Sequence, residues 1–309
     1  MTRTRKIRSP RSPRPATKEQ FHILVASSGD RTSDGAIRVA GSIALAKHAS
    51  VEVVTVATPF PHSAPSAFQV APPPVIDATA RSEAIARVRE QLARLGVDEG
   101  WPVAASLGWP ASRIANAASR WPASLLVVGL GEHGVLDRLL GSETAVKLAH
   151  HVAMPVLAVP EDAHGAPTHA LVAIDFASTS VDAALEAAKL VGPNGVITLA
   201  HASVLVAESS PPGSFGDVFT AGVVEKLRAI RDQLQLSAGC RVDAVALPGE
   251  IVPSLLAYAE SHHCDLIAVG GQERAFVERL LVGSIRSKVL RHARQAVLVV
   301  APSEASQPS

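Results

Sequence analysis

Two stretches of the chain, about 140 residues apart, are nearly identical in pattern, and this internal repeat limits the possible folds more than any other feature. Residues 125–129 (LLVVG) precede a loop and residues 138–142 (RLLGS), while residues 266–270 (LIAVG) precede a loop and residues 279–284 (RLLVGS). In both copies an apolar strand leads through glycines into the start of a helix, where free backbone N–H groups can hold phosphate. The repeat therefore predicts two copies of one domain, each with a candidate anion site.

Alternating strand and helix patterns surround both stretches. A helix is predicted where Ile85, Val88, Leu92 and Leu95 recur at helical spacing before Gly96. Strands are predicted near residues 22–26, 51–56, 103–107, 125–129 and 155–160, and again near 170–174, 196–201, 240–246, 264–270 and 296–301. Helices are predicted between them, and residues 59–74, which are rich in proline, are predicted to form an extended loop. This order is typical of two open, doubly wound parallel sheets in tandem, an α/β fold.

The repeat also sets the expected boundaries. Residues 21–160 and 169–302 are predicted to form the first and second domains, joined by a polar linker over 161–168. Residues 1–20 and 303–309 are predicted to be disordered tails. The apolar last strands, residues 156–159 and 297–300, would aggregate if left as open edges, so they are expected to pair with each other. A homodimer is a further option.

Composition excludes several classes of protein. Hydrophobic residues make up 47% of the chain and aromatic residues only 4%, which suits helices packed on a buried sheet. No apolar run approaches the roughly 20 residues of a membrane span, and the N-terminus lacks the pattern of a secretory signal. Cys240 and Cys264 are too few for a disulfide framework. A cytoplasmic protein with two reduced thiols is expected.

The net charge of +1 hides a strong asymmetry. Residues 1–18 hold seven of the 29 lysines and arginines and no acid, so the remaining 22 basic residues face 28 acidic ones. A body with a formal charge of about −6 is not built for nucleic acid. The basic tail is predicted to be a solvated extension, with contact to an anionic partner as the alternative.

These patterns together resemble the universal stress proteins in their tandem two-domain form, over essentially all of residues 21–302. The resemblance implies a Rossmann-like fold. In nucleotide-binding members, an Asp after the first strand is combined with a Gly-x2-Gly-x9-Gly-Ser/Thr loop, whose glycines let the backbone approach the phosphates. The implied ligand is an adenine nucleotide, ATP, with or without Mg²⁺.

The second copy fits that motif better. Asp175, Gly270, Gly283 and Ser284 match the family positions, but Glu273 replaces the second glycine. A carboxylate there would repel a triphosphate unless a cation intervened. Arg286 follows the loop, either as a phosphate clamp or as an ordinary surface arginine. If nucleotide binds, we expect it in this domain.

The first copy departs from the motif in two ways. Ser28 stands where the family has Asp, with Asp30 as an alternative carboxylate, and the glycine loop is one residue short. The weaker candidates for nucleotide contacts here are Ser28, Gly129, Gly131, Gly141, Ser142 and Thr144.

No catalytic constellation is recognisable. The pairs at 150–151 and 262–263 are predicted to be helix-end histidines, because neighbours on a helix point about 100° apart and rarely chelate one ion. No nucleophile elbow and no Walker loop are present in the sequence. The expected function is therefore a non-catalytic regulator of a stress response that binds ATP, with slow ATP hydrolysis left open.

A second reading belongs to another class of protein. Because both glycine loops depart from the motif, the chain is alternatively a nucleotide-free interaction module. It would then bind an unidentified regulatory protein, with residues 59–74 as the docking element.

Overall fold

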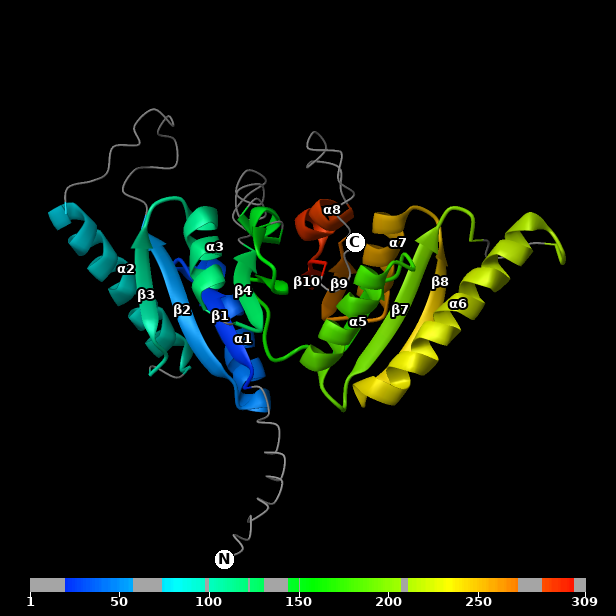
Figure 1. Ribbon diagram of the computed structural model, residues 1–309, viewed down its shortest axis with the longest axis horizontal. Coiled ribbons are helices and arrows are strands. Elements are labelled where there is room, and N and C mark those ends of the chain that lie inside the picture. Colours follow the sequence, from blue (N-terminus) through cyan, green and yellow to red (C-terminus); the bar gives the residue numbers. More distant parts are fainter. Residues whose placement is uncertain are drawn as a thin grey trace, which may run out of the picture.

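The computed structural model describes residues 20–57, 74–97, 100–121, 123–130, 144–149, 151–206, 211–271 and 285–302. Two similar α/β halves stand side by side, with their last strands meeting at the centre of the molecule (Figure 1). Within the described residues, no helix is both long and apolar enough to cross a membrane.

The first domain alternates strands and helices in the predicted order. Its elements are β1 (His22–Ala26), the short 3-10 helix η1 (Arg31–Ser33), α1 (Asp34–Lys47), β2 (Ser50–Ala57), α2 (Pro74–Leu95), β3 (Val103–Leu107), α3 (Pro110–Arg120), β4 (Leu125–Leu130) and β5 (Val156–Pro160). Residues 144–149 are also helical.

The second domain repeats this order. Its elements are β6 (His169–Ala173), α5 (Ser178–Val191), β7 (Val196–Ser203), α6 (Phe215–Ala238), β8 (Arg241–Pro248), α7 (Ile251–Ser261), β9 (Leu266–Gly270), α8 (Ile285–His292) and β10 (Ala296–Val300). The predicted α/β fold is confirmed.

One continuous sheet runs through both domains. Its ten strands follow the order β3-β2-β1-β4-β5-β10-β9-β6-β7-β8. Neighbours pair in parallel, except at the junction, where β5 and β10 are antiparallel with Leu157 opposite Leu298. We call this β5–β10 junction the seam. It joins the two strands for which the sequence predicted pairing, so the two open sheets become one.

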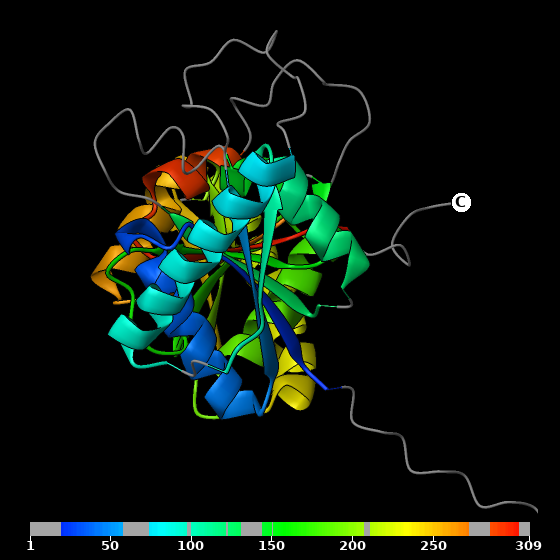
Figure 2. The same ribbon diagram turned by 90° about the vertical axis from the view of Figure 1, so that its left-hand side faces the viewer.

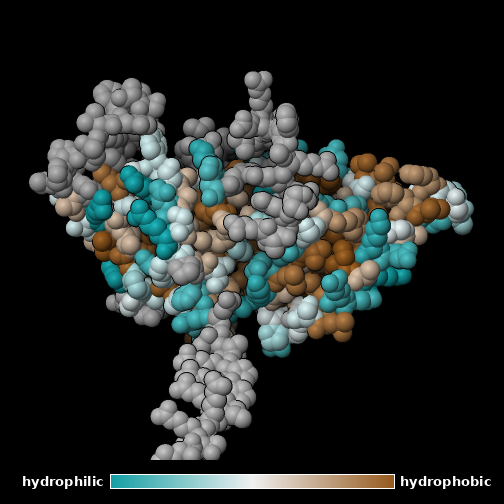
Figure 3. All heavy atoms as spheres, in the orientation of Figure 1, coloured by the Kyte–Doolittle hydropathy of each residue, from teal (hydrophilic) through white to brown (hydrophobic). Residues whose placement is uncertain are grey.

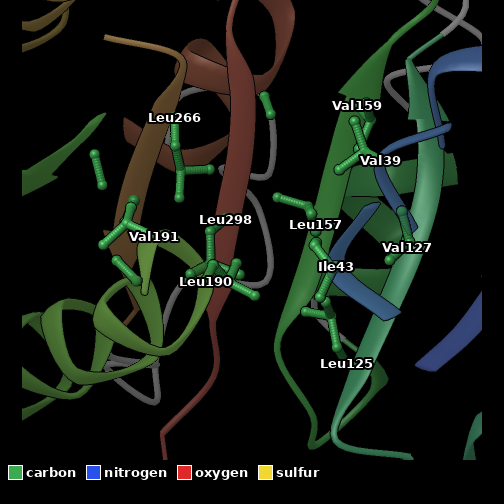
Figure 4. Close-up of a cluster of buried hydrophobic side chains, with 14 of the residues drawn as sticks. Val39, Ile43, Leu125, Val127, Leu157, Val159, Leu190, Val191, Leu266 and Leu298 are labelled. Atoms are coloured by element: carbon green, nitrogen blue, oxygen red, sulfur yellow. The ribbon is translucent and has the colours of Figure 1, made fainter. Parts of the chain in front are cut away.

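The core lies in two layers, one on each face of the sheet. Alternate residues of a strand point to opposite faces, so Leu157 and Val159 join the layer under α1 and α5, whereas Val156 and Ala158 join the opposite layer. Figure 2 shows the first domain's strands between helices on either side, and Figure 4 shows the first layer near the seam. Because each layer includes residues of both domains, the core is continuous across the seam.

Several strand ends differ by one or two residues from the sequence-based expectation, among them those of β7, β8 and β9, and two boundaries have a clear cause. Pro74, predicted as the end of a loop, is the first residue of α2, a position that proline favours because its missing N–H has no partner there anyway. β7 extends two residues beyond the predicted end, to Ser203, because it pairs with β8 over its full length. The rest of the predicted loop at residues 59–74 lies outside the described residues.

Candidate functional site

The candidate site of each domain lies where strand order reverses in the sheet. β1 lies between β2 and β4, and β6 lies between β7 and β9, so the first strand of each domain is the point of reversal. The registers Ala26↔Val128 and Ala173↔Val269 place the ends of these strands side by side. Ligands of open α/β sheets bind at such carboxyl ends.

Asp175 lies two residues beyond the end of β6 and is exposed. Its Oδ1 accepts a hydrogen bond from the backbone N–H of Ala177, 3.0 Å away, which fixes the turn into α5. No described residue donates to its Oδ2. The carboxylate is therefore held in place by one oxygen, and the other is left without a donor among the described residues.

Phe176, the next residue, has a left-handed backbone with φ +66°. Its ring lies 4.7 Å from the ring of His201 at the end of β7, and Lys226 Nζ lies 5.5 Å from the ring centroid. His201 Nδ1 donates to the carbonyl of Ile174 at 2.8 Å. The sequence patterns did not reveal this cluster, because it depends on a backbone conformation that phenylalanine rarely adopts.

Ser28, the equivalent of Asp175, is engaged differently. Its hydroxyl donates to Asp30 Oδ1 at 2.9 Å, and Asp30 in turn caps η1 by accepting from the backbone N–H of Thr32 at 3.0 Å. The following residue, Gly29, has φ +80°, so glycine occupies here the left-handed position that phenylalanine holds in the second domain. Asp30 is thus a helix cap in this structure, and the first domain carries its carboxylate two residues further along the turn than Asp175 in the second.

A buried polar network lies beneath the Ser28 turn. Gln91 of α2 is only 1% exposed, and its side-chain N–H donates to the carbonyl of Asp30 at 2.7 Å and to Asp34 Oδ1 at 2.7 Å. The Ser27 hydroxyl donates to Gln91 Oε1 at 2.6 Å. In the second domain the position of Ser27 is held by Ile174, which is buried in the core. The side chains beneath the two candidate sites therefore differ: they form a polar network in the first domain and apolar packing in the second.

Gly129 and Gly270 are required by packing. A Cβ at Gly270 would lie 2.7 Å from the backbone nitrogen of Ser180 and would overlap the carbonyl of Thr179. A Cβ at Gly129 would lie 3.0 Å from Ser33 Cα. Each glycine lets the first helix of its domain approach the fourth strand, independently of any ligand.

Arg286 is the second residue of α8 and is half-buried. Its guanidinium lies over Gly271, so closely that any side chain at that position would overlap it. The structure thus places Arg286 beside Gly270 at the end of β9. Thr144 is half-buried in the helical turn of residues 144–149. The other predicted contacts lie outside the described residues: Gly131, Gly141 and Ser142 in the first domain, and Gly283 and Ser284 in the second.

Of the histidines predicted at helix ends, His151 and His262 are found there, and His150 lies outside the described residues. His151 Nδ1 contacts the carbonyl of Lys147 at 2.6 Å, and His262 stacks on Tyr258 at 3.7 Å between ring centroids. Over the described ranges, no three His, Cys, Asp or Glu side chains come together as a metal site. Cys240 and Cys264 are buried free thiols.

Comparison with known proteins gives consistent matches. The model of the "Universal stress protein family" matches residues 21–160 and again residues 167–301. A universal stress protein of Mycolicibacterium smegmatis is 26% identical over 294 residues, which cover 92% of this chain and 98% of the relative.

Solved structures show the same fold over nearly the whole chain. A universal stress protein from Archaeoglobus fulgidus superposes with a TM-score of 0.67 at 17% identity, covering 92% of this chain and 99% of that one. A functionally unknown protein from Pseudomonas aeruginosa PAO1 has a TM-score of 0.60 at 15% identity, with 93% and 94% covered.

Proposed function

The chain belongs to the universal stress protein family, with two domains in tandem, and on that premise we propose that it is a non-catalytic stress-response regulator whose second domain binds ATP. The observation that carries the proposal is Asp175. It lies at the strand reversal beside Gly270, with one carboxylate oxygen fixed by the backbone and the other without a donor among the described residues. An oxygen held in this way can accept a hydrogen bond from a ribose hydroxyl or a base amino group.

The difference between the domains supports binding in the second domain alone. Ser28 lacks the charge of a carboxylate, and its hydroxyl is already committed to Asp30. Asp30 is a carboxylate, but it lies two residues further along the turn than the position of Asp175, and its Oδ1 already accepts from Ser28 and Thr32 as the cap of η1. We expect one nucleotide per chain.

Arg286 extends the proposed site toward the phosphates. It stands at the start of α8, where the helix dipole also favours negative charge. In the proposal, Gly270, Gly283 and Ser284 supply close backbone approach and Arg286 supplies a charged donor. Glu273 opposes phosphate, so Mg²⁺ is expected to tighten binding by screening that repulsion.

The test begins with acid extraction of the purified protein and chromatography of whatever nucleotide it releases. Calorimetric titration with ATP, with and without Mg²⁺, then measures affinity and stoichiometry. Asp175→Ala should weaken binding about 10- to 100-fold, the value of one or two hydrogen bonds to a charged group. Ser28→Ala is the matched control and should leave affinity unchanged. Equal losses from both substitutions would refute binding in one domain, and phosphate release above background would refute the non-catalytic role.

An exposed apolar surface favours the second candidate function, a nucleotide-free module that binds a regulatory protein. At the start of α6 and in the turn after β7, Phe215 is 72% exposed, Val218 63% and Val204 72%. Hydrophobic atoms gather over this outer corner of the second domain (Figure 3). Contiguous apolar surface of this kind marks protein contacts. No binding at millimolar ATP would select this function over the first.

A further inference from the structure

A cleft of about 410 Å³ lies between α5 and the seam. Asp182, Leu185, Glu186 and Lys189 line one wall, on successive turns of one face of α5. The opposite wall includes Pro155, just before β5, and the end of β10. Neither Asp175 nor Gly270 lines the cleft, so it is distinct from the proposed nucleotide site. Its volume falls in the range of small-molecule sites, which often lie at domain junctions.

The matching place in the first domain is filled by the chain itself. Gly35 and Arg38 of α1 correspond to Asp182 and Leu185, because Gly129 contacts Ser33 as Gly270 contacts Ser180. Gly35 lets the carbonyl of Pro160 approach so closely that any side chain would collide with it. Arg38 donates to the carbonyls of Glu161, at 2.5 Å, and of Ala163, at 3.2 Å. In the second domain, a carboxylate and a leucine take these two positions and an open cleft remains.

The negative charge of the Asp182 carboxylate is not balanced by a positively charged partner among the described residues. Its Oδ2 is shielded from solvent and accepts no hydrogen bond, and no described residue forms an ion pair with it. Lys189, on the same wall, is paired with Glu186 at 2.6 Å. Seven residues of helix separate Lys189 from Asp182, about 10 Å along the axis. A half-buried carboxylate beside apolar walls gains most from a charged donor.

The two ends of the cleft differ in charge. Lys47 of α1 lies close enough to Lys189 and Glu186 for their charges to act on its ammonium group. The wall at the Lys189 end therefore holds one cation and one anion, with Lys47 as a second cation nearby, whereas the wall at the Asp182 end holds an anion alone. A ligand with one positive group would place it at Asp182 and lay its apolar part along Leu185 and Val300.

We propose that this cleft binds a small organic cation, an ammonium group on an apolar body of about six carbons. The proposal is independent of nucleotide binding. None of the residues that line the cleft belongs to the proposed nucleotide site.

The test uses three probes of one shape on the full-length protein: hexylamine, hexanol and hexanoate. Titration followed by NMR chemical shifts should show hexylamine binding at least tenfold more tightly than hexanol, and hexanoate not at all. Asp182→Asn keeps the side-chain shape and should reduce hexylamine affinity to that of hexanol. Asp232→Asn, which changes an exposed acid of α6 paired with Arg231, is the matched control and should have no effect.

A second variant tests the location. Leu185→Trp enlarges a side chain that is 39% exposed in the cleft and should abolish binding of both hexylamine and hexanol. Circular dichroism of each variant confirms folding before titration. The proposal is overturned if amine and alcohol bind equally, if hexanoate binds best, or if Asp182→Asn leaves the amine affinity unchanged.

Discussion

Arg94 and Asp34 form a two-pronged ion pair that ties α2 to the start of α1. Arg94 Nη1 lies 2.7 Å from Asp34 Oδ2, and Nη2 lies 2.8 Å from Oδ1. The Asp34 side chain is 7% exposed and that of Arg94 is 46% exposed. With Gln91 the pair completes the polar network under the Ser28 turn. This network holds the first domain's strand end in place, as apolar packing does in the second.

We expect the ion pair to make stability depend on pH. Burial alone would raise the pKa of Asp34, but hydrogen bonds from Arg94 and Gln91 and the charges of Arg94 and Arg38 outweigh it and lower that pKa. Because the folded pKa is depressed, the stabilisation is present above the unfolded value of about 3.9 and is lost as pH falls through the folded pKa.

Asp34→Asn should therefore lower the free energy of unfolding by about 1 kcal/mol at pH 7, discounted for the exposure of Arg94. Urea unfolding at pH 7 and at pH 3 measures the effect, and the difference between variant and wild type should shrink at the lower pH. A constant difference across that range would contradict the assignment.

Two glycines offer a matched test of close packing. Gly270→Ala would push a methyl group into the backbone of Thr179, so we expect a loss of about 1–3 kcal/mol of stability. Gly222 lies within α6 with nothing within 4 Å of an added Cβ. Gly222→Ala should stabilise the protein by up to about 1 kcal/mol through helix propensity. Thermal unfolding of both variants should shift in opposite directions, and a shared direction would argue against the packing role.

The seam can be probed by leucine truncation. Leu157 is 0% exposed and lies opposite Leu298, so Leu157→Ala should cost about 2–5 kcal/mol. Leu45 of α1 is 80% exposed, and Leu45→Ala should change stability by less than about 0.5 kcal/mol. Chemical denaturation gives both values. Similar small effects would mean that the seam contributes little.

Cys264 should be chemically inert in the folded protein. Burial, followed by the charge of Asp265, raises the pKa of its thiol to about 11. At pH 8 only about one thiol in 1,000 would then be thiolate, the form that reacts. Mass spectrometry after iodoacetamide treatment should find Cys264 unmodified in native protein and modified in urea. Rapid alkylation of the native protein would show that the site opens.

The sequence predicted the fold well because the fold rests on features repeated in the chain. The apolar strands and the helical spacing of Val88 and Leu92 appear in the structure as expected, and both side chains are fully buried. Gln91 shows what hydrophobic spacing misses. It shares that buried face, yet a glutamine gives no signal in an apolar pattern, since only its hydrogen-bond partners on other elements explain its burial.

The candidate site was predicted less completely, for physical reasons. Asp175 and Gly270 could be found by matching the two copies to a family motif, and the parallel register brings them together. Phe176 could not, because its role follows from a left-handed backbone and from a ring contact with His201. Asp30 was an ambiguous carboxylate in the sequence, and only its short contacts with Thr32 identify it as a helix cap.

The antiparallel seam also changes how substitutions act. In a symmetric dimer of single domains, each strand at the junction would meet an identical copy of itself, and every mutation there would enter the interface twice. Here β5 meets β10, a strand of different sequence in the same polypeptide. A mutation in one of these strands therefore occurs only once in the interface, and a substitution in the other strand can compensate for it. Because both domains lie in one chain, their sequences can diverge while the domains stay paired. Their ratio is also fixed at one to one at any protein concentration.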